Sequence, residues 1–190
     1  MARTVDHEYR QTLTERAAAH LLDQGRIDVS LRELAAAVDV SPRMLVHYFG
    51  SREGLLSRAL GEARSRQRGA FEARLTPQAG RPYPDVLTDA WRWFTSDEAQ
   101  PYMRLFGQLY ALAGAPGSPH AGFLRDSVLD WLPTLEAGFA ADGAAPDAAR
   151  ELATLTVGVI RALLQDASAT GEMERVDAAF KRYVALLRRA

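Results

Sequence analysis

Residues 38–56 read VDVSPRMLVHYFGSREGLL, and this short stretch contains two helix starts. Ser41 stands directly before Pro42, which pairs a serine N-cap with a proline at the first helical position. Ser51 predicts a second start about ten residues later. The stretch therefore predicts a short helix that ends near Phe49, followed at once by a longer one.

Another short helix is predicted just before, over Ser30–Val38. Its first residues, SLRE (30–33), fit a capping box, in which the serine accepts a hydrogen bond from a free backbone N–H and the glutamate reaches back. Only Asp39-Val40 separates this helix from the next, over Ser41–Phe49. Two short helices joined by such a tight turn are typical of a helix-turn-helix, whose second helix enters the major groove of DNA.

The second short helix has two distinct faces. Leu45 and Phe49 are four residues apart and should anchor the helix to a core. Arg43, Val46 and His47 lie on another face, with side chains that can bond guanine, contact a thymine methyl group and bond base edges or phosphate. Short capped helices also occur in many helical bundles, so the spacing alone leaves DNA binding and ordinary packing open.

Composition narrows the class of protein. The 190 residues are 47% hydrophobic and 25% charged, as in an ordinary globular protein, and the net charge of −1 means that only local charge could favour nucleic acid. The absence of cysteine excludes disulfides and thiolate metal sites, and the four histidines show no metal-ligand spacing. The polar N-terminus and the lack of a long apolar run predict a cytoplasmic protein with no membrane segment.

Apolar residues recur at helical spacing along the whole chain, and no period-two alternation is present. Loop signals rich in Gly and Pro occur at 76–84, 113–122 and 141–147. The fold class is therefore predicted as all-α, with about nine helices.

From about Leu13 to Leu60 the sequence resembles the TetR family of bacterial transcriptional regulators. The resemblance rests on an apolar helix, then Gly25, and then VSLRELAAAVDVSPRMLVHYFGSREGLL (29–56), whose spacing matches the family pattern throughout. The turn glycine of the family is here Asp39, a residue that tolerates a left-handed backbone better than most. The tyrosine that often follows Leu45 in the family is here Val46.

The resemblance implies an architecture and a set of partners. Residues 1–60 would form a three-helix DNA-binding helix-turn-helix domain with the start of a connecting helix, and residues 61–190 a helical regulatory, ligand-binding and dimerisation domain. The protein would be a homodimeric repressor of a palindromic double-stranded operator, released by a small organic effector. No cofactor and no metal are expected.

The resemblance also assigns candidate DNA contacts. Those on the DNA backbone are expected from Ser30, Arg32, Ser41, Tyr48 and Arg52, and the resemblance leaves a base contact open for Arg32 as well. Those of the reading helix are expected from Arg43, Met44, Val46 and His47.

Aromatic side chains are concentrated in the middle of the chain. A mostly apolar cavity with a few polar groups is how small-molecule sites are built, although ordinary core packing is the simpler interpretation for any one aromatic. The resemblance implies an effector pocket here, and the aromatic content favours a planar or greasy molecule over a sugar or a metal. The candidate lining is Trp91, Phe94, Met103, Phe106, Gln108, Tyr110 and Trp131.

The segments 148–167 and 176–187 are apolar on more than one side and must be covered accordingly. They either complete a monomeric core or pair with their copies in a second subunit, as TetR-like proteins typically do. The candidate interface residues are Val157, Gly158, Val159, Leu163, Phe180 and Val184.

Enzymatic activity is not expected, because the sequence contains no phosphate-binding glycine loop, nucleophile elbow or other catalytic motif. The alternative to a repressor is a helical protein-interaction or small-molecule-binding module whose DNA binding has degenerated.

Overall fold

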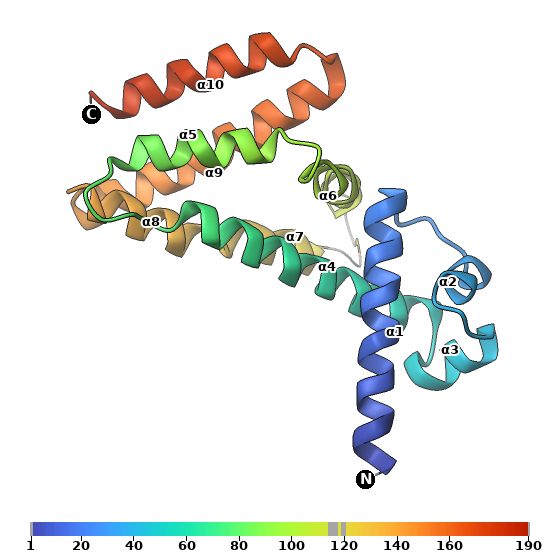
Figure 1. Ribbon diagram of the computed structural model, residues 1–190. Helices are drawn as coiled ribbons and strands as arrows, with labels where there is room; N and C mark the ends of the chain where they lie inside the picture. Colours follow the sequence, from blue (N-terminus) through green and yellow to red (C-terminus); the bar gives the residue numbers. More distant parts are fainter. Residues whose placement is uncertain (1, 114–117, 119–120, 190) are drawn as a thin grey trace.

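The computed structural model describes residues 2–113, 118 and 121–189, and these residues form helices and no strand (Figure 1). The all-α prediction is confirmed, with ten helices over the described residues where about nine were expected. Their bounds are α1 Ala2–Gln24, α2 Leu31–Ala37, α3 Pro42–Phe49, α4 Arg52–Leu75, α5 Tyr83–Phe94, α6 Gln100–Ala113, α7 Ala121–Leu129, α8 Leu132–Ala141, α9 Pro146–Thr170 and α10 Met173–Leu187. None of these described helices is both long and apolar enough to cross a bilayer.

The three serine caps begin the helices that the sequence predicts. The hydrogen bonds run from Glu33 N to Ser30 Oγ (3.1 Å), from Met44 N to Ser41 Oγ (3.2 Å) and from Gly54 N to Ser51 Oγ (3.0 Å). Each bond satisfies one of the backbone donors that the first turn of a helix leaves without a partner. The starts of α2, α3 and α4 are therefore set by local sequence.

The second half of the expected capping box does not form. The Glu33 carboxylate pairs with Arg26 at 2.5 Å instead of reaching back to the backbone of Ser30. A guanidinium gives a carboxylate a charge-assisted bond, which is stronger than one from a neutral amide. This ion pair links the loop after α1 to α2.

Asp39 adopts the left-handed backbone that its place in the turn requires. Its φ is 59°, and it is the only residue other than glycine with a positive φ in the described chain. Its N–H donates to the carbonyl of Ala36 at 3.2 Å and so closes the end of α2. The expectation that aspartate can replace glycine in this turn is confirmed.

This backbone makes the turn sensitive to the shape of the residue at 39. Replacing Asp39 by valine should lower the free energy of unfolding by about 1–2 kcal/mol, because a branched Cβ is poorly tolerated at positive φ. Replacing it by glycine should change stability by less than about 0.5 kcal/mol, since relieved strain offsets the added entropy of the unfolded chain. Urea unfolding of both variants measures the difference; equal stabilities would contradict a strained turn.

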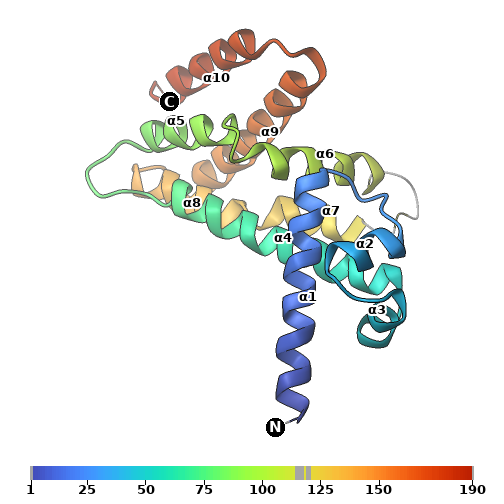
Figure 2. The ribbon, with the colours of Figure 1, turned by 45° about the vertical axis from the view of Figure 1, so that its right-hand side comes forward.

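Two hydrophobic clusters share α4, the helix that runs from the N-terminal helices to the C-terminal ones (Figure 2). The first joins α1, α2 and α3 to the N-terminal half of α4, ending at Ala63, and the second begins at Phe71 and joins α4 to α5, α8, α9 and α10. The connecting helix therefore extends well beyond residue 60, where the sequence placed the domain boundary. The predicted loops at 76–84 and 141–147 lie largely between helices, and most of 113–122 lies outside the described residues.

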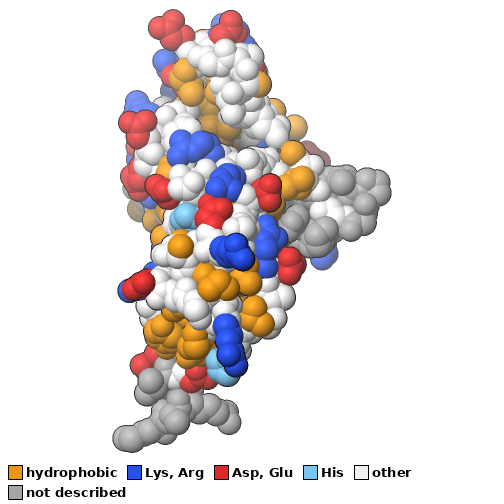
Figure 3. Space-filling view, turned by 90° about the vertical axis from the view of Figure 1, so that its right-hand side faces the viewer, with side chains coloured by type: hydrophobic (Ala, Val, Ile, Leu, Met, Phe, Trp, Pro, Cys, Tyr) orange, Lys and Arg blue, Asp and Glu red, His pale blue; other side chains and the backbone are white. Residues whose placement is uncertain are grey.

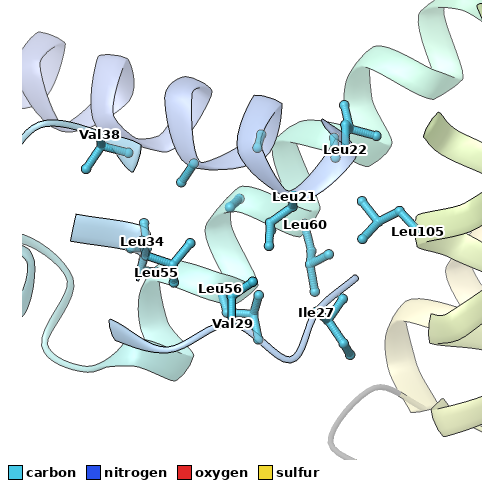
Figure 4. Close-up of a cluster of buried hydrophobic side chains, with 14 of the residues drawn as sticks. Leu21, Leu22, Ile27, Val29, Leu34, Val38, Leu55, Leu56, Leu60 and Leu105 are labelled. Carbon is cyan, nitrogen blue, oxygen red and sulfur yellow. The ribbon is translucent and has the colours of Figure 1, made fainter. Parts of the chain in front are cut away.

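Helix α6 contributes to the first cluster although it follows in the second half of the fold. Leu105 and Leu109 are buried there against residues of α1 and α4, and Figure 4 shows Leu105 pointing from α6 toward the cluster. Helix α1 is thus packed directly on a helix of the C-terminal region.

Candidate DNA-binding surface and ligand cavity

Helix α3 presents the predicted reading face to the outside. Leu45 is completely buried in the first cluster, whereas Arg43, Met44, Val46 and His47 on the same helix are exposed. Figure 3 views the molecule from the side that bears α2 and α3, and Lys or Arg side chains run down this face among exposed hydrophobic ones. Leu45, with the half-buried Tyr48 and Phe49, therefore packs α3 on this cluster, and the face formed by Arg43, Met44, Val46 and His47 is open to a partner.

The two arginines of this surface are not engaged within the chain. Neither Arg32, on α2, nor Arg43 has an ion-pair or hydrogen-bond partner among the described residues, and both are exposed. Most other arginines in the fold are paired with carboxylates or backbone carbonyls. An exposed, unpaired guanidinium can bond a phosphate or the edge of a guanine.

The cap serines keep a donor for an outside acceptor. Ser30 and Ser41 are exposed, and each hydroxyl oxygen accepts the capping bond, so its hydrogen can still point to a phosphate oxygen. Both lie at the N-terminus of a helix, where the dipole favours an anion.

Tyr48 is half-buried beside α1. Its ring makes edge contacts with Tyr9, at a centroid distance of 5.5 Å, and with His47, at 5.2 Å. Desolvation and then the negative charge of Asp6 raise the pKa of the Tyr48 phenol. Sequence reasoning missed Tyr9, because only the packing of α1 brings it to α3.

Arg52 has a role in the fold that the sequence did not indicate. Its Nε donates to the carbonyl of Val29 at 2.6 Å and its Nη2 to that of Ile27 at 3.3 Å. A third, weak contact joins Nη1 to Glu53 at 3.4 Å. The guanidinium therefore fastens the loop before α2 to the start of α4, and its expected contact with phosphate stays a prediction.

A cavity of about 600 Å³ lies within the helical C-terminal region. Its lining is drawn from α4, α5, α6, α8, α9, the start of α10 and Trp131 just before α8. Five of the seven predicted lining residues are present: Phe94, Met103, Phe106, Tyr110 and Trp131. The aromatic interior that the sequence predicted therefore encloses a space of the size that small-molecule sites have.

The other two predicted lining residues are placed elsewhere. Trp91 stacks on Phe180, with centroids 4.3 Å apart, and donates its Nε1 hydrogen to Asp177 at 2.7 Å. Gln108 turns to the N-terminal region, where its Oε1 accepts from the backbone N–H of Ile27 at 3.4 Å. Both predictions were wrong because periodicity does not tell which face of a helix meets the cavity.

Polar groups in the cavity wall were missed by sequence reasoning. Arg161, from α9, donates through Nη2 to the Tyr110 hydroxyl at 3.2 Å and to the Ser127 carbonyl at 2.8 Å. Burial raises the pKa of the Tyr110 phenol, and the nearby charges of Arg161 and Arg64 offset only part of this rise. The sequence contains one feature that could have identified Arg161, because it is the single charged residue within the largely apolar run TLTVGVIRALL (154–164).

The predicted interface residues divide into buried and accessible ones. Phe180 and Val184 are buried in the second cluster of the same chain, and Val157 lines the cavity, so these three have little area left for a second copy. Gly158 is exposed, whereas Val159 and Leu163 are half-buried.

Two exposed leucines on the last helices were not predicted. Leu155 on α9 and Leu186 on α10 are 59% and 56% exposed, the two highest values among the large hydrophobic side chains of the described residues.

These observations define a helix-turn-helix domain joined to a helical domain that contains a cavity. Residues 13–59 match the family described as bacterial regulatory proteins, tetR family. Over 73 residues the chain is 37% identical to the HTH-type transcriptional regulator BetI of Rhizobium meliloti (strain 1021). The aligned part covers 36% of this chain and 36% of that relative.

Solved structures extend the likeness to nearly the whole fold. A transcriptional regulator from Rhodococcus sp. Rha1 superposes with a TM-score of 0.71 at 22% identity, covering 91% of this chain and 94% of the other. Salmonella enterica GusR superposes with a TM-score of 0.69 at 21% identity, covering 95% of each chain. At these identities the likeness establishes the architecture of both domains.

Proposed function

We propose that the protein is a transcriptional regulator that binds a palindromic DNA operator as a homodimer and is released by a small organic effector. Such a protein acts in the bacterial cytoplasm, where the DNA is. The observation that carries the proposal is the open face of α3, where Arg43, Val46 and His47 are exposed around the buried anchor Leu45. An α-helix with these side chains fits the major groove.

The exposed leucines of α9 and α10 support a homodimer. Leu155 and Leu186 are each more than half exposed, and a Cβ placed on Gly158 would meet nothing within 4 Å. A second copy of the same two helices would cover these residues and form a four-helix interface. A twofold dimer would place its recognition helices about 34–36 Å apart, one turn of DNA, or a multiple of that distance.

Helix α6 supports a link between the cavity and the DNA-binding domain. Arg104 lines the cavity and also packs on Gly25, at the end of α1. One turn further along α6, Gln108 accepts the hydrogen bond from Ile27, in the loop that Arg52 holds from the other side. A ligand that shifts α6 would therefore move this loop, to the extent that it binds one arrangement more tightly than the other.

Replacing Arg43 by alanine should relax base preference at one position of each half-site, by about 1–3 kcal/mol if the arginine bonds a guanine. Arg32→Ala is the matched comparison, because Arg32 is equally free but is expected at the backbone. It should weaken all sequences alike and reduce the salt dependence of binding by about two ions, one for each half-site. Competition binding with a set of single-base operator variants measures both; a loss from Arg43→Ala that is the same for every variant would contradict base reading.

A further inference from the structure

The cavity wall carries positive charge and, among its described residues, no compensating acid. Arg104 and Arg161 both line it, and no aspartate or glutamate is among the described residues of the lining. Arg161 has no ion-pair partner in the part of the chain that the structure describes, in contrast to Arg64 nearby, which pairs with Asp130 and, at 3.6 Å, with Asp126. A half-buried guanidinium without a counter-ion favours an anionic ligand.

The free donors of Arg161 are available to such a ligand. Its two hydrogen bonds, to Tyr110 and Ser127, both leave from Nη2, so the N–H groups of Nε and Nη1 have no acceptor in the described chain. The guanidinium lies over the ring of Tyr110, 4.8 Å from the centroid. The Tyr110 oxygen accepts from Arg161, so the phenol hydrogen is free to donate to a further acceptor.

Gln67 is a second polar group without a partner. It lies on α4, is only 7% exposed, and lines the same cavity without a hydrogen bond to any residue that the structure describes. Gln67 follows Arg64 by three residues and so shares its face of α4, and Arg64 acts electrostatically on Tyr110. A buried amide without a partner costs free energy unless a ligand or water completes its bonds.

The rest of the wall is apolar. Phe71, Phe94, Leu135 and Trp131 contribute aromatic and aliphatic surface, and Phe71 packs edge-on to Trp131 with centroids 4.1 Å apart. A ligand that fills the space must therefore carry a sizeable apolar body as well as its polar group.

We propose that the cavity binds an amphipathic organic monocarboxylate, whose carboxylate accepts hydrogen bonds from Arg161, Tyr110 and Gln67. Its hydrocarbon or aromatic body packs on the apolar wall. The inference rests on the proposed role of the cavity as the effector site and names the chemical class of that effector.

The test is calorimetric titration of the purified full-length protein, without DNA, with two sets of matched compounds. One set is naphthylacetate, naphthylacetamide and naphthylethylammonium, and the other is octanoate, octanamide and octylammonium. In the set whose apolar group fits the cavity, the carboxylate should bind at least about tenfold more tightly than the amide, and the ammonium compound should bind most weakly. Equal binding within both sets, or no binding of either carboxylate at millimolar concentration, would overturn the proposal.

Variants separate recognition from folding. Arg161→Gln should weaken the carboxylate by about 10- to 100-fold and leave the amide nearly unchanged. Gln67→Leu, which keeps the volume, should weaken the carboxylate several-fold without lowering the melting temperature. Arg150→Gln is the control, since Arg150 is exposed on the same helix α9 and outside the cavity. An equal loss of carboxylate and amide in Arg161→Gln would make Arg161 only a support for Tyr110 and would overturn its role.

A last titration separates this inference from the proposed function. The carboxylate that binds is added to the protein on its selected DNA. Binding that releases the DNA supports both the carboxylate site and the proposed release of DNA by an effector. Binding to the free protein without an effect on DNA would keep the carboxylate site and count against effector-controlled regulation.

Discussion

Replacing Leu155 and Leu186 together by arginine is expected to give a folded monomer whose affinity for its operator is about 100- to 10,000-fold lower. Both side chains are more than half exposed in the single chain, so their replacement should cost the fold less than about 0.5 kcal/mol. In the proposed dimer the same positions are covered by the second copy. Arginines there would bring like charges together in an apolar interface, which would then not form.

The affinity loss follows from the operator's two half-sites. A dimer engages the second half-site at a high effective concentration, and a monomer must bind each half-site separately. Sedimentation velocity gives the oligomeric state, and fluorescence anisotropy with a full operator and with a half-site gives the affinities. The control is Leu129→Arg on α7, where a leucine is also exposed but lies outside the last two helices. A double variant that is still dimeric would place the interface elsewhere.

Leu45→Ala should lower the free energy of unfolding by about 2–5 kcal/mol, because it removes a completely buried side chain and leaves a cavity. Leu45 is the one residue of α3 that is fully buried in the first cluster, so the helix loses its anchor. DNA binding should fall for every sequence alike, since an unanchored reading helix cannot hold any of its contacts in place. Chemical denaturation measures the first effect and competition binding the second.

The neighbouring residue provides the matched comparison. Val46 is 43% exposed, so Val46→Ala should change stability by less than about 0.5 kcal/mol. If Val46 touches a thymine methyl group, its loss should weaken operators with thymine at one position and spare the others. A large loss of stability in Val46→Ala, or a loss of base preference without loss of stability in Leu45→Ala, would contradict the assignment of the two faces.

Local chemistry explains why the N-terminal domain could be predicted so closely. Ser30, Ser41 and Ser51 each bond a backbone N–H three residues ahead, so the sequence around each cap is enough to place the helix start. Asp39 could be assigned to the turn because few residues other than glycine accept a positive φ. The contacts of Arg52 with the Ile27–Val29 loop and of Tyr9 with Tyr48 join residues far apart in sequence, and no local pattern reveals them.

For the C-terminal domain, the sequence predicted the presence of a cavity but misplaced several of the side chains assigned to it or to the dimer interface. The concentration of aromatic residues in the middle of the chain predicted a cavity. Most of the candidate lining residues do line it, because apolar periodicity identifies the inward faces of helices. Periodicity does not distinguish a face on the core from one on a cavity, which is why Trp91 and Gln108 were misplaced. For the same reason Phe180 was assigned to a dimer interface although it is buried in its own chain, while the exposed Leu155 and Leu186 were overlooked.

We propose that the open face of α3 reads a DNA sequence and that two copies of the protein do so together. Selection of bound fragments from a random duplex library by the purified protein, at near-physiological salt, tests it most directly. We expect a palindromic motif with half-sites about one helical turn apart, or a multiple of that spacing. Recovery of no motif, both from protein refolded free of any co-purified ligand and at low salt, would contradict it.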